Sequence, residues 1–189
     1  MVKKGSKTEH NLLASFAGES QARNRYTMYA SKAKEEGLRQ IEALFLETAD
    51  HERMHAQRLF RLLPGEPVEI TATYPTAIGD TAFNLKAAAA GENEEHTELY
   101  PKAAEVADEE GYPEVAKQFR EIAKVEVEHE KRYLKLLKNL EEGRVFKRGT
   151  KVFWKCRKCG RIIEAAQAPL QCPTCGHPQG HFELFVEAY

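Results

Sequence analysis

The sequence of 189 residues contains no hydrophobic run long enough to cross a membrane, and its most apolar short run, residues 87–90, is only alanine. Lysines near the N-terminus are not followed by a long apolar stretch, so we expect no signal peptide. Net charge is also nearly absent, with 28 Lys and Arg against 29 Asp and Glu. Nothing in this balance favours nucleic acid or a membrane as a partner, and we expect a cytoplasmic protein.

Cysteine is scarce, and its four copies fall in two Cys-x-x-Cys-Gly units, CRKCG at 156–160 and CPTCG at 172–176. No cysteine is left over for a disulfide framework. Two such units close together predict a tetrathiolate metal site formed by Cys156, Cys159, Cys172 and Cys175. Zinc and iron use the same four ligands, and this motif taken alone favours zinc.

Residues from about 6 to 142 are rich in Ala, Glu, Leu and Lys with the periodicity of amphipathic helices. The first predicted helix starts at a capping box, Ser6 to Glu9, and ends at Gly37. Three further helices are expected over residues 39–63, 80–110 and 112–142, and Pro101 should kink or interrupt the third. The segment 64–79 contains three prolines and no helical period, so it is a long crossover.

A short link, a long crossover and a second short link are the connections of a ferritin-like four-helix bundle. After residue 144 the sequence becomes aromatic and β-branched, with Gly and Pro, which predicts short strands and metal-binding knuckles. We therefore expect a mainly α chain with two domains. They are a bundle over residues 1–146 and a small β-rich metal domain over residues 147–189.

In each predicted helix, apolar residues at helical spacing define a stripe that must face the core. Every stripe is interrupted near its middle by glutamate, and two of them carry Glu-x-x-His. In chain order the stripes are Leu12, Phe16, Glu19, Arg23, Tyr26 and Ala30; Phe45, Thr48, Glu52, His55, Leu59 and Leu62; Leu85, Ala88, Glu92, Glu95 and Leu99; and Val115, Phe119, Ile122, Glu126, His129, Tyr133 and Leu136.

Ionised carboxylates in a core are costly unless they are paired or bind a metal. Five glutamates and two histidines cannot neutralise one another, whereas two divalent cations would. A single glutamate on such a stripe is more often a boundary residue with its carboxylate in water. Here, however, Glu19 precedes Glu52 by 33 residues and Glu92 precedes Glu126 by 34, as in two related helical hairpins. This constellation is typical of di-iron carboxylate proteins.

The remaining histidines are not predicted to be ligands. His10, His51 and His96 lie off the stripes and are expected to be solvated. His177 and His181 lie beside the cysteines without the spacing of metal ligands. Next to a di-iron site the balance at the cysteines shifts from zinc to iron, because a redox centre needs an electron source and zinc has no redox chemistry.

Long segments of the sequence resemble the rubrerythrin family over essentially the whole length. They are FAGESQARNRY, ETADHERMHAQRLF, AAAGENEEHTELYP, EVEHEKR, EEGRVF, CRKCG and CPTCGHP. The resemblance implies that Glu52 and Glu126 bridge two irons. It also implies that Glu19 and Glu92 are terminal ligands and that His129 holds one iron.

By the same resemblance, His55 and Glu95 exchange as ligands of the other iron when the redox state changes. Tyr26 and Tyr100 match family tyrosines beside the site. The C-terminal part resembles a shortened rubredoxin. The implied activity is reduction of hydrogen peroxide to water by a homodimer or larger oligomer. Electrons would come from a reductase or rubredoxin through the tetracysteine iron.

Three other functions are compatible with parts of the pattern. Iron oxidation and storage, as in ferritins, would have no use for an attached tetrathiolate electron carrier. An O2-activating di-iron oxidase would need an apolar substrate pocket, which the sequence does not exclude. A non-enzymatic metal-binding protein would carry zinc at the cysteines, and a colourless protein would identify it.

Overall fold

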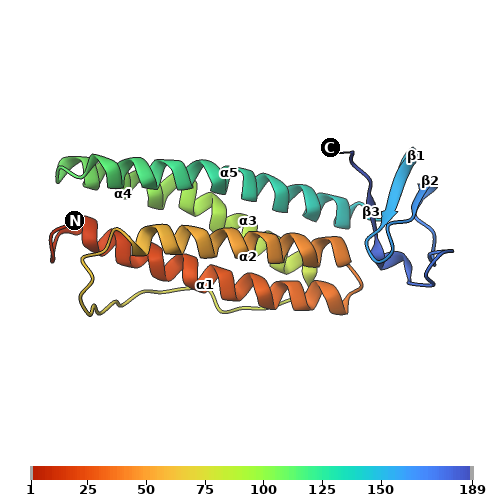
Figure 1. The fold of residues 1–189 in the computed structure, drawn as a ribbon, viewed down its shortest axis with the longest axis horizontal. Coiled ribbons are helices and arrows are strands. Elements are labelled where there is room, and N and C mark those ends of the chain that lie inside the picture. Colours follow the sequence, from red (N-terminus) through yellow and green to blue (C-terminus); the bar gives the residue numbers. More distant parts are fainter. Residues whose placement is uncertain (1, 188–189) are drawn as a thin grey trace.

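The computed structural model describes residues 2–187. The N-terminal part consists of long helices that lie side by side (Figure 1). A small three-stranded sheet lies at one end of the bundle. The mainly α architecture with a long crossover is therefore confirmed. The helices are α1 (Lys7–Glu35), α2 (Arg39–Phe60), α3 (Thr81–Glu94), the π-helix η1 (Glu95–Leu99), α4 (Tyr100–Glu109) and α5 (Pro113–Glu141).

The ends of α1 agree with the predicted signals. The Ser6 hydroxyl accepts a hydrogen bond from the Glu9 backbone N–H at 3.1 Å. The Glu9 carboxylate accepts one from the Gly5 N–H at 2.6 Å, one residue before the position that a capping box normally uses. Beyond the other end, Gly37 adopts a φ of 75°, a left-handed conformation that residues with a Cβ rarely adopt.

The second helix is shorter than expected, because α2 ends at Phe60 rather than at residue 63. The Leu62 and Leu63 N–H groups bond to carbonyls three residues earlier, at 3.0 and 3.2 Å. Such tight bonds end the helix before Pro64, whose ring disfavours helical geometry in the residue that precedes it.

The third helical segment is interrupted at Pro101, as predicted, but the interruption takes the form of a π-helix. Pro101 has no N–H, and the Tyr100 N–H bonds to the Glu95 carbonyl, five residues earlier. The wide turn accommodates one extra residue and rotates α4 relative to α3. Leu99, expected on the core-facing stripe, is therefore 51% exposed, and Tyr100 is buried in its place.

The stripe of α1 also differs from the prediction at one position. Arg23 is exposed, whereas Ala22 is buried. The positions three and four residues after Glu19 lie on nearly the same helix face. The small Ala22 can enter the core there without removing a charge from water, as Arg23 would.

The bundle has two apolar clusters with a polar layer between them. The first cluster includes Tyr26, Phe45, Leu85 and Tyr133 and lies toward the small sheet. The second lies toward the far end of the bundle and is built from Leu12, Leu59, Tyr100, Val115, Phe119 and Ile122. Along every helix the predicted glutamates fall between the two clusters, so burial on both sides fixes the depth of the polar layer.

The crossover between α2 and α3 runs along α1 (Figure 1). The Tyr74 hydroxyl donates to the Ala14 carbonyl at 3.1 Å. The Gln21 side chain donates to the Pro75 carbonyl at 3.0 Å, and the Tyr29 hydroxyl to the Ala77 carbonyl at 3.1 Å. These bonds attach an otherwise irregular segment to the bundle.

The small sheet has the order β2-β1-β3 with antiparallel pairing. Its strands are β1 (Lys147–Cys156), β2 (Ile162–Gln167) and β3 (Phe182–Leu184), with a 3₁₀ turn, η2 (Gln179–His181), before β3. Its own core consists of Trp154, Cys156, Ala168, Cys172 and Phe182. Phe146 packs against this core and against the nearer cluster of the bundle, so it is the joint between the two parts.

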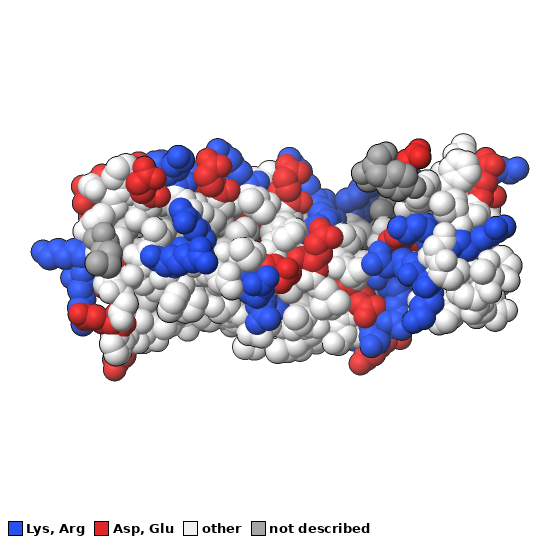
Figure 2. Space-filling model, viewed as in Figure 1, with Lys and Arg blue, Asp and Glu red and all other residues white. Residues whose placement is uncertain are grey.

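The surface of the bundle carries charges of both signs. Acidic and basic side chains are interspersed along the face shown in Figure 2, and basic residues gather where the bundle meets the small sheet. Among the described residues, no helix has the length and apolar character needed to cross a membrane.

The domain boundary at residues 146 and 147 stays a prediction, and a chain ending at Phe146 tests it. Both apolar clusters of the bundle would remain, together with the Phe146 ring, so we expect the far-UV circular dichroism of a helical protein and one cooperative thermal transition. Loss of helicity or of the cooperative transition would show that the bundle depends on the sheet.

Candidate metal centres

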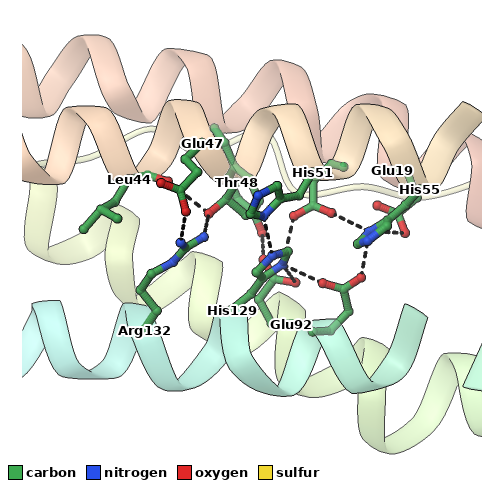
Figure 3. Close-up of polar contacts among 12 residues, drawn as sticks. Glu19, Leu44, Glu47, Thr48, His51, His55, Glu92, His129 and Arg132 are labelled. Atoms are coloured by element: carbon green, nitrogen blue, oxygen red, sulfur yellow. Dashed lines mark hydrogen bonds and ion pairs between the residues drawn. The ribbon is translucent and has the colours of Figure 1, made fainter. Parts of the chain in front are cut away.

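The polar layer of the bundle brings together side chains from four helices (Figure 3). The ligand atoms form two groups, and within each group all atoms lie within 4.8 Å of one another. One group is formed by Glu19, Glu52, His55 and Glu126, and the other by Glu52, Glu92, Glu126 and His129. Two carboxylates belong to both groups, which is the arrangement that a pair of bridged metal ions requires.

The histidines face carboxylate oxygens rather than solvent. His55 Nδ1 lies 3.0 Å from Glu52 Oε2, 3.0 Å from Glu126 Oε1 and 3.6 Å from Glu19 Oε1. His129 Nδ1 lies 2.6 Å from Glu126 Oε2 and 3.3 Å from Glu52 Oε1. Both Glu-x-x-His pairs therefore aim oxygen and nitrogen from one helix face at the same point.

Many of these buried atoms have no hydrogen-bond partner among the described residues. They are Glu19 Oε2, Glu52 Oε1, Glu92 Oε2, both carboxylate oxygens of Glu126, and His129 Nδ1. An unsatisfied buried polar atom costs about 1–3 kcal/mol, and more when it is charged. Hard oxygen donors with imidazole nitrogens suit divalent iron, so the residues fit the metal that the composition of the site implies.

Burial and mutual repulsion govern the acids of the cluster. Burial raises the pKa of Glu19 and of Glu92 well above the usual range, and the nearby Glu52 charge adds to both shifts. Burial, together with Glu126 and Glu52, raises the pKa of Glu95 from 4.5 to about 8. Without metal, burial therefore favours the neutral form of these carboxyls.

The pKa values of the two histidines are raised, although burial by itself would lower them. Burial alone would lower the pKa of His129, but the close carboxylates of Glu126 and Glu52 outweigh it and raise the pKa to about 9. The same balance raises the pKa of His55 well above its usual range. Burial would raise the pKa of Glu52, but these two imidazoles lower it to about 2.

Two buried tyrosines touch the outer carboxylates of the cluster. The Tyr26 hydroxyl donates to Glu92 Oε1 at 2.6 Å, and the Tyr100 hydroxyl donates to Glu19 Oε1. Both phenols therefore lie beside the site and hold a carboxylate that comes from a different helix.

Glu95 lies at the start of η1 and belongs to neither group of ligand atoms. It is half-buried and lines a cavity of about 320 Å³, together with Arg25, Tyr74 and Tyr100. Its exchange with His55 as an iron ligand remains a prediction.

Two histidines expected in solvent are only partly exposed and contact other side chains. His51 Nδ1 lies 3.0 Å from His129 Nε2, and His96 Nε2 lies 2.6 Å from Glu130 Oε2. Both are half-buried and contact a residue of α5. A residue outside the core-facing stripe of its own helix can still meet a neighbouring helix. The only sequence signal was that His51 directly precedes Glu52. His10 is exposed, as expected.

The four cysteines converge in the small sheet domain. Their sulfurs all lie within 4.8 Å of one another, with Cys156 and Cys175 at 3.8 Å and Cys159 and Cys172 at 3.7 Å. None forms a disulfide. Each Cys-x-x-Cys turn closes at its glycine, whose N–H bonds to the carbonyl of the first cysteine. Four convergent thiols fit a single tetrahedral ion.

The Nδ1 atom of neighbouring His177 contacts the Cys175 carbonyl at 3.2 Å. Its ring packs edge-on against that of His181, with centroids 4.9 Å apart. Neither histidine is among the ligand atoms that converge here, in agreement with the sequence analysis.

Comparison with known proteins identifies the family. The family model described as rubrerythrin matches residues 10–137, and the one described as the rubredoxin-like domain of rubrerythrin matches residues 154–183. The chain belongs to the rubrerythrin family. Rubrerythrin of Porphyromonas gingivalis is 59% identical over 98% of this chain and 94% of that protein. Rubrerythrin of Nitratidesulfovibrio vulgaris is 53% identical over 96% of this chain and 95% of that protein.

Solved structures agree with this membership. Fully reduced nigerythrin has a TM-score of 0.65 at 31% identity and covers 97% of this chain and 89% of its own. Dithionite-reduced symerythrin from Cyanophora paradoxa also has a TM-score of 0.65, at 25% identity, over 75% of this chain and 89% of its own. The ferritin-like bundle with a rubredoxin-like domain is confirmed.

Rubrerythrins are generally di-iron proteins of oxidative-stress defence that work with electron donors such as rubredoxin. The chain is thus an iron oxidoreductase, and the expectation of iron in the carboxylate–histidine cluster and at the cysteines is confirmed. The role of each side chain toward each ion stays a prediction.

The register of α5 provides a direct test of the ligand assignment. Glu126 is completely buried in the cluster, whereas the Glu128 side chain is 70% exposed and pairs with Lys131. We expect Glu126→Ala to lose most of its di-iron metal, because it removes a carboxylate shared by both groups. Glu128→Ala should keep the metal, since exposed ion pairs contribute little. Iron per chain in the two variants is the measurement, and the reverse result would mean that the register is wrong.

The metal-free protein should be most stable near pH 5. The stability contributed by Glu95 and His129 is fully present below their unfolded pKa values and is lost as pH rises through about 8 for Glu95 and about 9 for His129. The raised pKa values of Glu19 and Glu92 act in the same direction. The lowered pKa of Glu52 acts only below about 4.5. Each proton by which the folded and unfolded states differ changes stability by about 1.4 kcal/mol per pH unit.

Thermal unfolding of metal-free and iron-loaded protein between pH 5 and 8.5 checks this expectation. The metal-free midpoint should fall across the range, and the loaded protein should not show this fall because cations replace the protons. A metal-free protein that gains stability over the same range would contradict the account of the buried acids.

Proposed function

We propose that the chain is a non-haem di-iron peroxidase that reduces hydrogen peroxide to water. The single observation that carries the proposal is the presence, in one chain, of a buried two-metal carboxylate cluster and a tetracysteine site. Reduction of one peroxide takes two electrons and two protons and yields two waters. Two ferrous ions bound in the cluster would supply both electrons at once, so the O–O bond is cleaved without release of a radical.

In this proposal, Glu52 and Glu126 would hold both ions, because their oxygens belong to both groups of ligand atoms. Glu19 and Glu92 would each hold one ion, and His129 would hold one of the two. His55 and Glu95 would be alternative ligands of the other.

The side chains around the cluster are suited to supplying protons. Burial raises the pKa of Tyr26 and of Tyr100 well above the usual range, so both phenols stay protonated while they donate to carboxylates. Glu95, with its pKa raised to about 8 by burial and by Glu126 and Glu52, holds a proton at the wall of the cavity. We propose that these three groups are catalytic and donate to the departing oxygens.

The cavity between α1, η1 and the crossover supports peroxide as the substrate. Its volume of about 320 Å³ holds several small molecules, since one water occupies about 30 Å³ of liquid. Glu95, Tyr100, Tyr74 and Arg25 lie on its wall. The cavity therefore offers space for a small substrate beside Glu95 and Tyr100.

The tetracysteine iron carries one electron at a time, so two deliveries recharge the cluster. We propose that a reductase or rubredoxin supplies them and that the working form is a homodimer or larger. Exposed apolar side chains on α1 and α2, Met28, Met54 and Phe60, support an assembly because large exposed apolar groups of this kind favour contact. Iron storage is not favoured, since it gives the cysteine site no role.

The test is a comparison of oxidants and of chain lengths. Anaerobically reduced full-length protein is mixed with hydrogen peroxide or with O2, and oxidation of the di-iron cluster is followed by rapid-mixing absorption. We expect peroxide to react faster by about tenfold or more, a barrier difference of about 1.4 kcal/mol. A chain ending at Phe146 should react once and then turn over poorly with a protein donor.

Two results would contradict the proposal. Faster reaction with O2 than with peroxide would favour an oxidase. Full steady-state turnover by the chain ending at Phe146 would remove the role assigned to the cysteines. As a control, Cys156→Ser in the full chain should abolish the red tetrathiolate absorption and leave the bundle's iron in place.

A further inference from the structure

His51 is a further imidazole next to the cluster, and it has no role in the proposed peroxidase reaction. It lies on α2 immediately before Glu52 and is half-buried between α2 and α5. Its Nδ1 lies 3.0 Å from His129 Nε2, and the two rings are stacked with centroids 5.2 Å apart and planes 11° from parallel. Figure 3 draws the contact between His51 and His129 as a dashed line.

The direction of this hydrogen bond depends on which ring nitrogen of His129 faces the metal ligands. Its Nδ1 is among the converging ligand atoms, 2.6 Å from Glu126 Oε2. A neutral imidazole has one nitrogen with a free lone pair and one with a proton. If Nδ1 is the nitrogen that binds iron, Nε2 carries the proton and donates it to His51 Nδ1. The proton of His51 is then on its own Nε2.

Among the surrounding polar groups, His51 is the acceptor available to the His129 Nε2–H group. Nearby on α2, Glu47 and Thr48 are hydrogen-bonded to Arg132, through Glu47 Oε1 and Thr48 Oγ1, each at 2.5 Å. Among the described residues, the only hydrogen-bond partner of His129 Nε2 is His51. A metal-bound histidine usually donates to a carboxylate, a carbonyl or water, and here a neutral imidazole takes that place.

We propose that His51 is a positioning residue of the di-iron site. By accepting the Nε2 proton of His129, it fixes the tautomer and the ring orientation that direct Nδ1 at the metal. The strength of the acceptor at this position also sets the reduction potential, because a stronger acceptor makes the ligand more electron-donating and favours ferric iron. The inference rests on the proposed role of His129 as a ligand and does not depend on peroxide as the substrate.

Four variants of the full-length protein separate hydrogen bonding from packing. His51→Asn keeps an acceptor oxygen near the position of Nδ1, and His51→Asp puts a charged acceptor there. His51→Phe keeps a ring that can stack on His129 but has no acceptor. His51→Ala removes both at a partly exposed helix position where alanine is the best helix former, so it should fold. His10→Phe, at an exposed position of α1, is the matched control.

The measurements are the iron retained per chain after challenge with a chelator and the midpoint potential of the di-iron cluster. We expect His51→Phe and His51→Ala to bind bundle iron about 10-fold more weakly or worse, whereas His51→Asn stays within a few-fold of the parent. The potential should be lowest in His51→Asp and highest in His51→Phe. The tetracysteine absorption should be unchanged in all of them, which reports intact folding of that domain.

Two outcomes would overturn the inference. In one, His51→Phe and His51→Ala keep parental affinity and potential. In the other, His51→Asn loses as much iron as His51→Phe, so that the acceptor is irrelevant. The failure of the proposed function looks different: the variants show the predicted order in affinity and potential, but the parent protein does not turn over peroxide.

Discussion

The structure depends on the electrostatic cost of placing at least four carboxylates in the middle of a helical bundle. Glu19, Glu52, Glu92 and Glu126 are almost completely buried, and several of their oxygens have no partner in the described protein. Removing such ions from water costs several kcal/mol each unless opposite charge is close. Two cations provide that charge. The cations therefore compensate the buried charge as well as forming the chemical centre.

The apolar clusters on either side make this arrangement possible. Because apolar clusters lie on both sides of the polar layer, packing among apolar side chains holds the helices together there, and the four glutamates are buried. Burial strengthens each hydrogen bond within the layer, including those of Tyr26 and Tyr100. Stability from packing and reactivity from the site thus come from different segments of the same four helices.

The π-helix connects a backbone constraint with the site. Pro101 cannot donate a backbone hydrogen bond, and the wide turn that precedes it turns Tyr100 into the core and places Glu95 at a cavity wall. A regular helix would have put Leu99 where Tyr100 is, and the phenol that donates to Glu19 would be absent. π-turns are rare and occur frequently at functional sites, and here the reason is explicit.

The sequence by itself determined the four helices, the crossover, the positions of Glu19, Glu52, Glu92 and Glu126 on core-facing stripes, and the convergence of the cysteines. These features depend on local geometry: helical periodicity aligns residues three and four apart, and each Cys-x-x-Cys turn closes on itself. The roles of the individual ligands were implied by family resemblance and remain predictions.

Only the tertiary structure decided the burial of Tyr100 and Ala22 in place of Leu99 and Arg23, and the contact of His51 with His129. The burial of Tyr100 depends on the π-turn before Pro101, and that of Ala22 on which of two neighbouring positions of α1 packs against the other helices. The contact of His51 with His129 depends on the distance between α2 and α5, which is set by side chains on both helices at once. Periodicity within one helix carries no information on that distance, so no single-helix pattern revealed it.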